Sequence, residues 1–504
     1  MPEITAASVS PSSVSRRRWL ATAAGALAGT ALSTQAQRAG RPPGLAREFR
    51  AAWMATVFNL DWPSRPGLPA GEQQAQLRAQ LDSAARLNLN AVIFQVRPSG
   101  DAVYASPLEP WSGFVSGAVG RSPGYDPLKF AIAEAHRRGL ELHAWFNPFR
   151  ARASKTYGPA GSHAAARHPE WTRAFAGGLF FDPGQPQVRE HTIRVIADVA
   201  RRYAVDGIHI DDYFYPYPPS GTPGLGASAF PDGETYAKYG RGQNRAAWRR
   251  SNVDAFVSGM YRAVKSARPS AKVGISPFGI WRPGVPAGIT GKLDSYEYLG
   301  ADARGWLARG WCDYLAPQLY WSIDPPDQSF SALLRWWHQQ NRSGRHLWPG
   351  MAIDRIGPSR PAREIIRQIA LTRDMASQGR AGQCHWALKG LRQNRGHIQE
   401  ALLSGPYASR AAVPATPWLG ASVPDAPRAL CGNGMMEITP TPGAQWTAVQ
   451  AWDGADWAMQ PLLPHDDTGN PIVLPVPARA RLLAVSALSP TGIESAPAML
   501  EIVG

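Results

Sequence analysis

Apolar and polar residues alternate along residues 207–211, with Ile208 and Ile210 on one face and His209 and Asp211 on the other. Successive side chains of a strand point to opposite faces, so the isoleucines would pack outwards while His209 and Asp211 point inwards. The pattern predicts a strand that ends in two aspartates, followed by an aromatic, proline-rich loop.

Strand-like and helix-like patterns alternate in the same way along most of the chain. Predicted strands cover residues 50–58, 91–97, 140–146, 207–211, 272–278, 313–320, 347–353 and 382–388, and predicted helices cover 72–87, 127–138, 188–203, 244–267, 330–341 and 361–377. Eight such units predict an α/β fold, a (β/α)₈ TIM barrel over residues 47–410. A doubly wound open sheet is the alternative, but it normally has a glycine-rich phosphate loop after its first strand, and the sequence has none there.

The long connections all follow predicted strands. They span residues 98–125, 147–184, 212–243 and 279–303, whereas links from helix to strand, such as 138–140, are short. Long loops at the carboxyl ends of the strands are typical of a barrel with an elaborated active-site face.

The residue pattern changes near residue 415, where prolines cluster and short strand-like segments follow. We expect a Pro-rich linker over 411–424 and a small β-sandwich, fibronectin type III-like, over 425–504. Such a module would brace the barrel or bind a partner, for which a cell-envelope or division protein is our expectation.

The N-terminus carries SRRRWL at residues 15–20, followed by an apolar run over 21–32 and a Thr34-Gln35-Ala36 site. This resembles a twin-arginine export signal, which predicts a signal peptide over 1–36, a linker over 37–46 and a periplasmic or secreted mature protein. A basic helix start is the alternative. The apolar run is too short to span a membrane, and no other segment approaches that length.

The amino-acid composition limits the class of protein to which the chain can belong. The 504 residues are 44% hydrophobic and 18% charged, as in globular proteins. The net charge of +15 comes from scattered arginines without a nucleic-acid-binding motif, so we expect no nucleic-acid partner. Three widely spaced cysteines form no zinc pattern and at most one disulfide.

The ends of the predicted strands would meet around one cleft. They supply carboxylates, amides, an arginine and many aromatic rings, which is the inventory of a glycosidase site: acids act on the bond, amides hold hydroxyls and rings stack on sugars. They contain no histidine-rich metal cage, no Ser–His–acid ordering and no lysine placed for a Schiff base, so we predict neither metal nor cofactor. The substrate is expected to touch Asn59, Arg97, Glu109, Trp145, Asn147, His209, Tyr213, Gln318, Tyr320 and Trp321.

Four of these residues have a second interpretation. His209 would lie one layer below Asp211, where a buried core histidine is the commoner outcome. Arg97 would bind a ligand or pair with one of the aspartates. Tyr320 and Trp321 would contact substrate or only line the wall.

The catalytic candidates are Asp211, Asp212 and Asp354. Alternation points Asp211 inwards as the nucleophile or charge stabiliser. Asp212 would either orient a loop or serve as the second acid, and Asp354 would be a partner carboxylate or a loop cap. The proton donor is open among Asp212, Asp354 and Glu109.

Several long motifs resemble the glycosyl-hydrolase-like family ten. They include FRAAWMATVFNLDWPS, VIFQVRPSGDAVYAS, GYDPLKFAIAEAHRRGLELHAWFNPFR, VDGIHIDDYFYP, GISPFGIWR and DYLAPQLYW, and the resemblance covers about residues 47–403. It implies a mostly exported glycoside hydrolase barrel, in a family that includes a divisome-associated peptidoglycan glycosidase. GIHIDD is also similar to a chitinase motif, but Tyr213 stands where that motif has its catalytic acid.

The sequence therefore predicts an exported glycosidase that acts on bacterial cell-wall glycan, the peptidoglycan strands. The alternatives are a non-catalytic glycan-binding protein of the envelope and a hydrolase of another extracellular polysaccharide.

Overall fold

The computed structural model describes residues 41–153, 156–158, 161–219, 230–325, 327–465 and 469–502. The described residues from 43 onwards form one compact unit. The predicted signal peptide and most of its linker lie outside the described residues. Within the described ranges, every helix is too short or too polar to cross a membrane.

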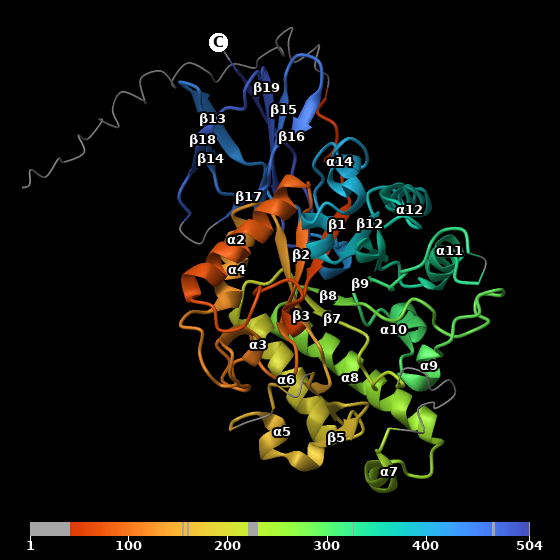
Figure 1. Ribbon diagram of the computed structural model, residues 1–504. Helices are drawn as coiled ribbons and strands as arrows, with labels where there is room; N and C mark the ends of the chain where they lie inside the picture. Colours follow the sequence, from red (N-terminus) through yellow and green to blue (C-terminus); the bar gives the residue numbers. More distant parts are fainter. Residues whose placement is uncertain are drawn as a thin grey trace, which may run out of the picture. The chain divides into compact units, whose positions relative to one another are not determined.

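A curled parallel sheet forms the centre of the fold (Figure 1). Its order is β10-β9-β8-β7-β3-β2-β1-β12-β11. The strands are β1 (Phe49–Met54), β2 (Ala91–Arg97), β3 (Glu141–Phe146), β7 (Gly207–Ile210), β8 (Lys272–Ile275), β9 (Tyr314–Leu315), β10 (His346–Leu347), β11 (Gly350–Ala352) and β12 (Gly382–Trp386).

The two ends of this sheet lie on one segment, because β10 and β11 are separated only by Trp348 and Pro349. The Trp348 amide donates to the Leu315 carbonyl (2.9 Å), on the β9 side. The Cys384 amide of β12 donates to the Pro349 carbonyl (3.0 Å) on the other side. The sheet therefore returns to itself along residues 346–352.

Helices follow the strands and lie around the sheet (Figure 1). Helices of ten residues or more are α2 (Ala70–Arg86), α4 (Pro127–His136), α6 (Pro186–Arg202), α8 (Arg245–Ala267), α11 (Phe330–Gln340) and α12 (Ala362–Met375), and α10 (Ala303–Arg309) and α14 (Ile398–Leu403) have seven and six residues. The short ones are α3 (Gly113–Ser116), α5 (Ala164–Arg167), α7 (Gly233–Tyr239), α9 (Ser295–Tyr298) and α13 (Leu388–Arg392), with 3₁₀ turns at η1 (Val57–Asn59), η2 (Pro169–Trp171), η4 (Ile353–Arg355), η5 (Arg395–His397) and η6 (Pro417–Leu419).

The predicted mixed α/β architecture and its parallel sheet are confirmed, with corrections to individual elements. The first strand ends at Met54 rather than at residue 58, because Phe58 and Asn59 take left-handed backbone angles (φ 55° and 54°) that a strand cannot hold. The sixth strand is only two residues long. Helix α10, which no pattern predicted, precedes it.

The alternation around residue 208 divides two layers of the core as expected. Ile208 and Ile210 pack outside the sheet among helix residues such as Val195 and Val199. The interior is filled by other inward side chains, including Phe49 of β1 and Trp348 between β10 and β11, whose rings stack with centroids 3.9 Å apart. Burial on both faces explains why the strands are so apolar.

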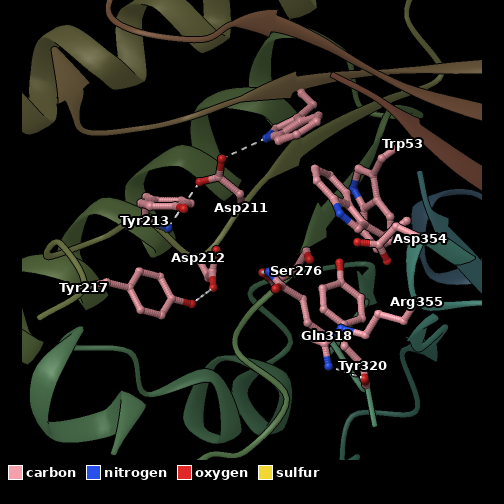
Figure 2. Close-up of a pocket in the computed structure, with 12 residues that line it drawn as sticks. Trp53, Asp211, Asp212, Tyr213, Tyr217, Ser276, Gln318, Tyr320, Asp354 and Arg355 are labelled. Carbon is pink, nitrogen blue, oxygen red and sulfur yellow. Dashed lines mark hydrogen bonds between the residues drawn. The ribbon is translucent and has the colours of Figure 1, made fainter. Parts of the chain in front are cut away.

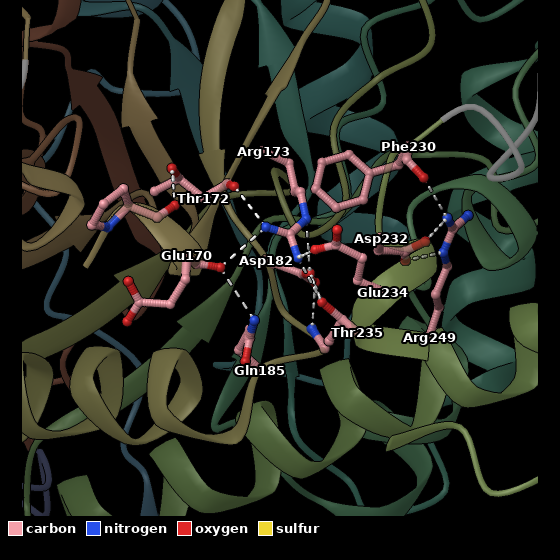
Figure 3. Close-up of polar contacts among 12 residues, drawn as sticks. Glu170, Thr172, Arg173, Asp182, Gln185, Phe230, Asp232, Glu234, Thr235 and Arg249 are labelled. Atoms are coloured by element: carbon pink, nitrogen blue, oxygen red, sulfur yellow. Dashed lines mark hydrogen bonds and ion pairs between the residues drawn. The ribbon is translucent and has the colours of Figure 1, made fainter. Parts of the chain in front are cut away.

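Two strand-to-helix insertions are fixed to each other beside the sheet. The first carries the antiparallel strands β4 (Arg150–Arg152), β5 (Thr172–Phe175) and β6 (Gly178–Phe181), which the sequence did not predict. Figure 3 shows the contact: Thr235 of α7 donates to Asp182 (2.6 Å), and buried Asp232 accepts two bonds from Arg249 of α8 (2.7 and 2.6 Å). These bonds hold the far end of the loop that follows β7.

The C-terminal region is made of antiparallel sheets, as the turn pattern predicted. Strands β13 (Arg428–Gly432), β14 (Met435–Thr439) and β18 (Ile472–Pro475) form one sheet, and β15 (Trp446–Trp452), β16 (Trp457–Met459), β17 (Leu463–Pro464), β19 (Leu482–Leu488) and β20 (Ala498–Glu501) form another. Side chains from both sheets share one core, which includes Met436, Ile438, Val449 and Val485.

This region and the residues before it contact the amino ends of the parallel strands. The Trp418 indole donates to Asp313 (2.9 Å), just before β9, and the Gln445 amide donates to Asp206, just before β7. The Trp446 ring meets His136 edge-on at 5.2 Å. The carboxyl ends of the strands are at the opposite face, where the loops are long.

Candidate active site

A cavity of about 280 Å³ opens at the carboxyl ends of the parallel strands (Figure 2). Seven of the parallel-strand segments or the loops after them contribute to it. Its lining residues are Trp53, Trp145, Asp211, Asp212, Tyr213, Tyr217, Ser276, Gln318, Tyr320, Asp354, Arg355 and Trp386.

Asp211 lies directly after β7 and is held by a set of donors. The Trp145 indole donates to Oδ2 (3.0 Å), the Asn147 amide donates to Oδ1 and Oδ2 (3.2 and 3.0 Å), and the Tyr213 backbone amide donates to Oδ1 (3.2 Å). Burial raises the pKa of Asp211, while Arg150 and these donors lower it. Burial is the larger effect, so the pKa of Asp211 stays above its usual value, although the donors favour the charged form.

Asp212 has a different environment, although it is the next residue. The Tyr217 hydroxyl donates to its Oδ2, as Figure 2 shows. Its pKa is raised to about 7, first by burial and then by the negative charge of Asp211, while hydrogen bonds from Tyr217 and Gln318 lower it. A carboxyl with this pKa holds its proton at neutral pH about half of the time.

Tyr213 and Arg150 contact each other near Asp211 and Asp212. The Arg150 guanidinium carbon lies 4.2 Å from the centre of the Tyr213 ring, a cation–π contact. The pKa of Tyr213 is raised by burial, so its phenol stays protonated. Tyr213 is therefore a hydrogen-bonding side chain in the cavity and cannot replace a carboxylic acid as proton donor at neutral pH.

Asp354 lies across the cavity in η4, at a more exposed position than Asp211 and Asp212 (Figure 2). Partial burial raises its pKa, against the charge of its neighbour Arg355. The structure therefore brings the three predicted catalytic aspartates to one cavity, together with the predicted substrate residues Trp145, Tyr213, Gln318 and Tyr320.

Two predicted substrate residues, Arg97 and Glu109, are buried away from the cavity, which corrects that prediction. The Arg97 Nε donates to Glu109 Oε2 (2.8 Å) and its Nη2 to Oε1 (2.5 Å), and His191 adds a contact at 3.2 Å. Arg97 lowers the pKa of Glu109 to about 2, against burial, which raises it. A carboxylate fixed in its charged form cannot be the proton donor.

Arg97 still acts on the site indirectly. Its Nη1 donates to the backbone carbonyls of Asn147 (2.8 Å) and Pro148 (2.9 Å). Asn147, which was predicted to touch substrate, uses its amide nitrogen for Asp211 and its amide oxygen for the Arg150 backbone (2.8 Å). The ion pair thus fixes the residue that holds Asp211.

Three further predictions are corrected by the contacts of the side chains. The Asn59 amide donates to the carbonyls of Pro63 (3.0 Å) and Phe114 (2.8 Å), which locks its own loop. The Trp321 ring packs edge-on against Phe278, with centroids 5.6 Å apart, outside the cavity lining.

His209, the third of these residues, does not line the cavity and is a core histidine, the commoner of the two outcomes expected for it. Its Nε2 accepts from the Trp53 indole (3.2 Å) and its Nδ1 is 2.9 Å from the Tyr314 hydroxyl. Burial lowers its pKa well below the usual range, so the ring is neutral. Since Trp53 can only donate, the proton of the ring is on Nδ1.

Sequence reasoning did not assign Trp53, Tyr217 and Arg355 to the site. Trp53 could have been found, since it lies on the inward face of β1 with Phe49 and Ala51. Tyr217 is in an irregular segment and Arg355 in the single 3₁₀ turn η4, and neither is long enough or regular enough for periodicity to indicate the direction of a side chain.

Comparison with known proteins gives one family. The model of the family described as "Glycosyl hydrolase-like 10" matches residues 48–364. The chain is 39% identical over 396 residues to glycosyl hydrolase YngK of Bacillus subtilis (strain 168), covering 76% of each chain. It is 35% identical over 343 residues to glycosyl hydrolase DigH of Escherichia coli (strain K12), covering 63% of this chain and 76% of that protein.

A solved structure is similar at lower identity. The PgaB (BpsB) glycoside hydrolase domain from Bordetella bronchiseptica is 15% identical, with a TM-score of 0.44, covering 70% of this chain and 98% of that domain.

Proposed function

The chain belongs to the glycosyl hydrolase-like 10 family, and on that premise we propose that it is a glycosidase that cleaves bacterial cell-wall glycan outside the cytoplasmic membrane. The observation that carries the proposal is the pair Asp211 and Asp212, two adjacent carboxyl groups in one cavity with different environments. Pairs of this kind divide the acid and base roles in glycosidases.

In this mechanism Asp212 is the general acid. Its pKa of about 7 lets it hold a proton at neutral pH and donate it to the glycosidic oxygen as the bond breaks. Tyr217 donates a hydrogen bond to Oδ2 and so keeps the carboxyl in a fixed orientation. This assignment takes the second of the two roles that the sequence left open for Asp212.

Asp211 is the charged partner. Three groups donate to its carboxylate, so its negative charge is oriented towards the sugar whose anomeric carbon becomes positive in the transition state. It acts there as nucleophile or electrostatic stabiliser. Asp354 lies across the cavity, where it would bind the sugar or assist the water molecule that completes hydrolysis.

Substrate binding is assigned to the remaining walls. The indoles of Trp53, Trp145 and Trp386 and the Tyr320 ring offer flat apolar faces to pyranose rings, and the Gln318 amide offers donors and an acceptor to hydroxyls. We interpret the curled sheet as a (β/α)₈ barrel, and the C-terminal sheets as a sandwich that braces it. A twin-arginine-type leader would deliver the protein to the periplasm or the exterior.

Hydrolysis is tested with the purified mature protein. Peptidoglycan glycan strands freed of peptides are incubated with the wild type, Asp211→Asn, Asp212→Asn and the exposed control Asp374→Asn, and soluble fragments are identified by mass spectrometry. We expect fragments from the wild type and the control, and at least a hundredfold fewer from the two site variants.

The same assay separates the other functions. Retention of glycan by the wild type without new reducing ends would identify a non-catalytic binding protein of the envelope. Cleavage of another extracellular polysaccharide in place of cell-wall glycan would overturn the cell-wall assignment and keep the glycosidase.

A further inference from the structure

In the described part of the chain, the cavity is lined by three carboxyl groups and one cationic side chain. Asp211, Asp212 and Asp354 contribute carboxyl groups. Among the described residues that line the cavity, Arg355 is the only lysine or arginine. Figure 2 shows its side chain beside Tyr320, on the wall that faces Asp211 and Asp212.

Arg355 is held in place from one side. Its Nη1 donates to the backbone carbonyl of Tyr320 (2.8 Å), and Arg360 donates to the same carbonyl (2.9 Å). Arg355 ends η4, whose Ile353 is buried against Gly390 of α13. Its backbone and one guanidinium nitrogen are therefore fixed by the protein.

The guanidinium of Arg355 forms no ion pair with a carboxylate of the described residues. Across the described ranges, no Asp or Glu oxygen lies within 4.0 Å of its nitrogens, although Asp354 is the preceding residue. Arg97 and Arg249, by contrast, each meet a carboxylate at 2.6 Å or less. The neighbouring Arg395 is also occupied, since it donates to the Asp354 carbonyl and to Gln393.

The fork of an arginine matches a carboxylate through two parallel N–H···O bonds, and this geometry is specific to planar anions. An anionic sugar that entered this cavity would be repelled by the aspartates unless a cation received its charge. Arg355 is the group that can do so, at the wall opposite Asp211 and Asp212.

We propose that Arg355 is a specificity-determining residue that binds a carboxylate carried by a sugar of the glycan, so that the substrate is an acidic glycan. The inference rests on the proposed function and deepens it, because it names the chemical group that the cavity recognises. A peptidoglycan strand carries such a group on each muramic acid whose carboxyl is not joined to a peptide.

The test compares one set of oligosaccharides in two chemical forms. Cell-wall oligosaccharides with free carboxylates are divided, and one half is converted to the neutral methyl amide. Affinity is measured by calorimetry in an Asp212→Asn background, which prevents turnover, and kcat/KM is measured in the wild-type background. The variants are Arg355→Gln, Arg355→Lys and, as a matched control, the exposed Arg363→Gln of α12.

We expect the carboxylate form to bind roughly 10- to 100-fold more tightly than the amide, the range for a hydrogen bond to a charged group. Arg355→Gln should abolish this preference and leave binding of the amide unchanged, and Arg355→Lys should keep part of it. Arg363→Gln should behave as the wild type. Thermal unfolding of each variant confirms that it is folded.

The outcomes separate the two proposals. Equal binding of both forms by the wild type overturns the role of Arg355, whether or not the glycan is cleaved. A preference that depends on Arg355, without cleavage in the wild type, supports the carboxylate site and overturns the hydrolase. A preference that survives Arg355→Gln places the carboxylate elsewhere, and loss of binding to both forms in that variant shows a structural role.

Discussion

The side-chain amide of Asn147 donates to both carboxylate oxygens of Asp211, at 3.2 and 3.0 Å. This contact joins the end of β3 to the end of β7. The Asn147 carbonyl is in turn held by Arg97, which is paired with Glu109. A buried ion pair outside the cavity is thus connected through Asn147 to the Asp211 carboxyl group of the site.

Replacing Asn147 with alanine should change the ionisation of Asp211. The lost hydrogen bonds stabilised the charged form, so the pKa of Asp211 rises and the acid limb of the pH–rate profile moves to higher pH. We expect kcat/KM to fall roughly 10- to 100-fold, since a hydrogen bond to a charged group is worth about 1.5–3 kcal/mol. An acid limb at the wild-type position would contradict this role.

Activity should decline as the pH rises through about 7. Asp212 acts in its protonated form, which predominates below its pKa of about 7 and is lost above it. The measurement is kcat/KM from pH 5 to 9. Asp212→Asn should remove the basic limb together with most of the activity, while Asp374→Asn keeps both.

Tyr217→Phe offers a finer test of the same group. The Tyr217 hydrogen bond lowers the pKa of Asp212, so its loss should raise that pKa and move the basic limb to higher pH. The activity at pH 6 should change much less than the position of the limb. A limb that moves to lower pH would rule out Asp212 as the titrating acid.

Glu109→Gln should destabilise the fold by about 3–5 kcal/mol, because it leaves the guanidinium of Arg97 buried without its partner. Urea unfolding measures this loss. The folded pKa of Glu109 is about 2, below its usual 4.5, so its contribution is complete above pH 4.5 and disappears as the pH falls towards 2. The wild type should therefore lose more stability than the variant over that interval.

Asn59→Ala should affect the fold and leave substrate affinity unchanged. The change removes two hydrogen bonds to backbone carbonyls and places alanine at a left-handed φ of 54°. We expect about 1–3 kcal/mol of lost stability, with KM unchanged at a temperature where the variant is folded. A raised KM without lost stability would restore Asn59 as a substrate ligand.

Periodicity alone determined much of this fold. Ile208 and Ile210 pack outwards and Asp211 points inwards as alternation requires, because a strand allows only two directions for a side chain. The second strand, 91–97, was predicted to the residue. The three aspartates assigned to catalysis also meet in one cavity, because parallel strands end at the same face of a sheet.

Tertiary structure decided the contacts between those elements. Arg97 and Glu109 are 12 residues apart, and only the path of the intervening loop brings the two charges together in the interior. The directions of Asp212 and Tyr217 depend on irregular backbone, and that of Arg355 on a single 3₁₀ turn, so no repeating pattern in the sequence indicates them. The sequence by itself determined which residues reach the carboxyl face, and the packing of loops on that face decided which of them line the cavity, which are locked in ion pairs, and which carboxyl group keeps its proton.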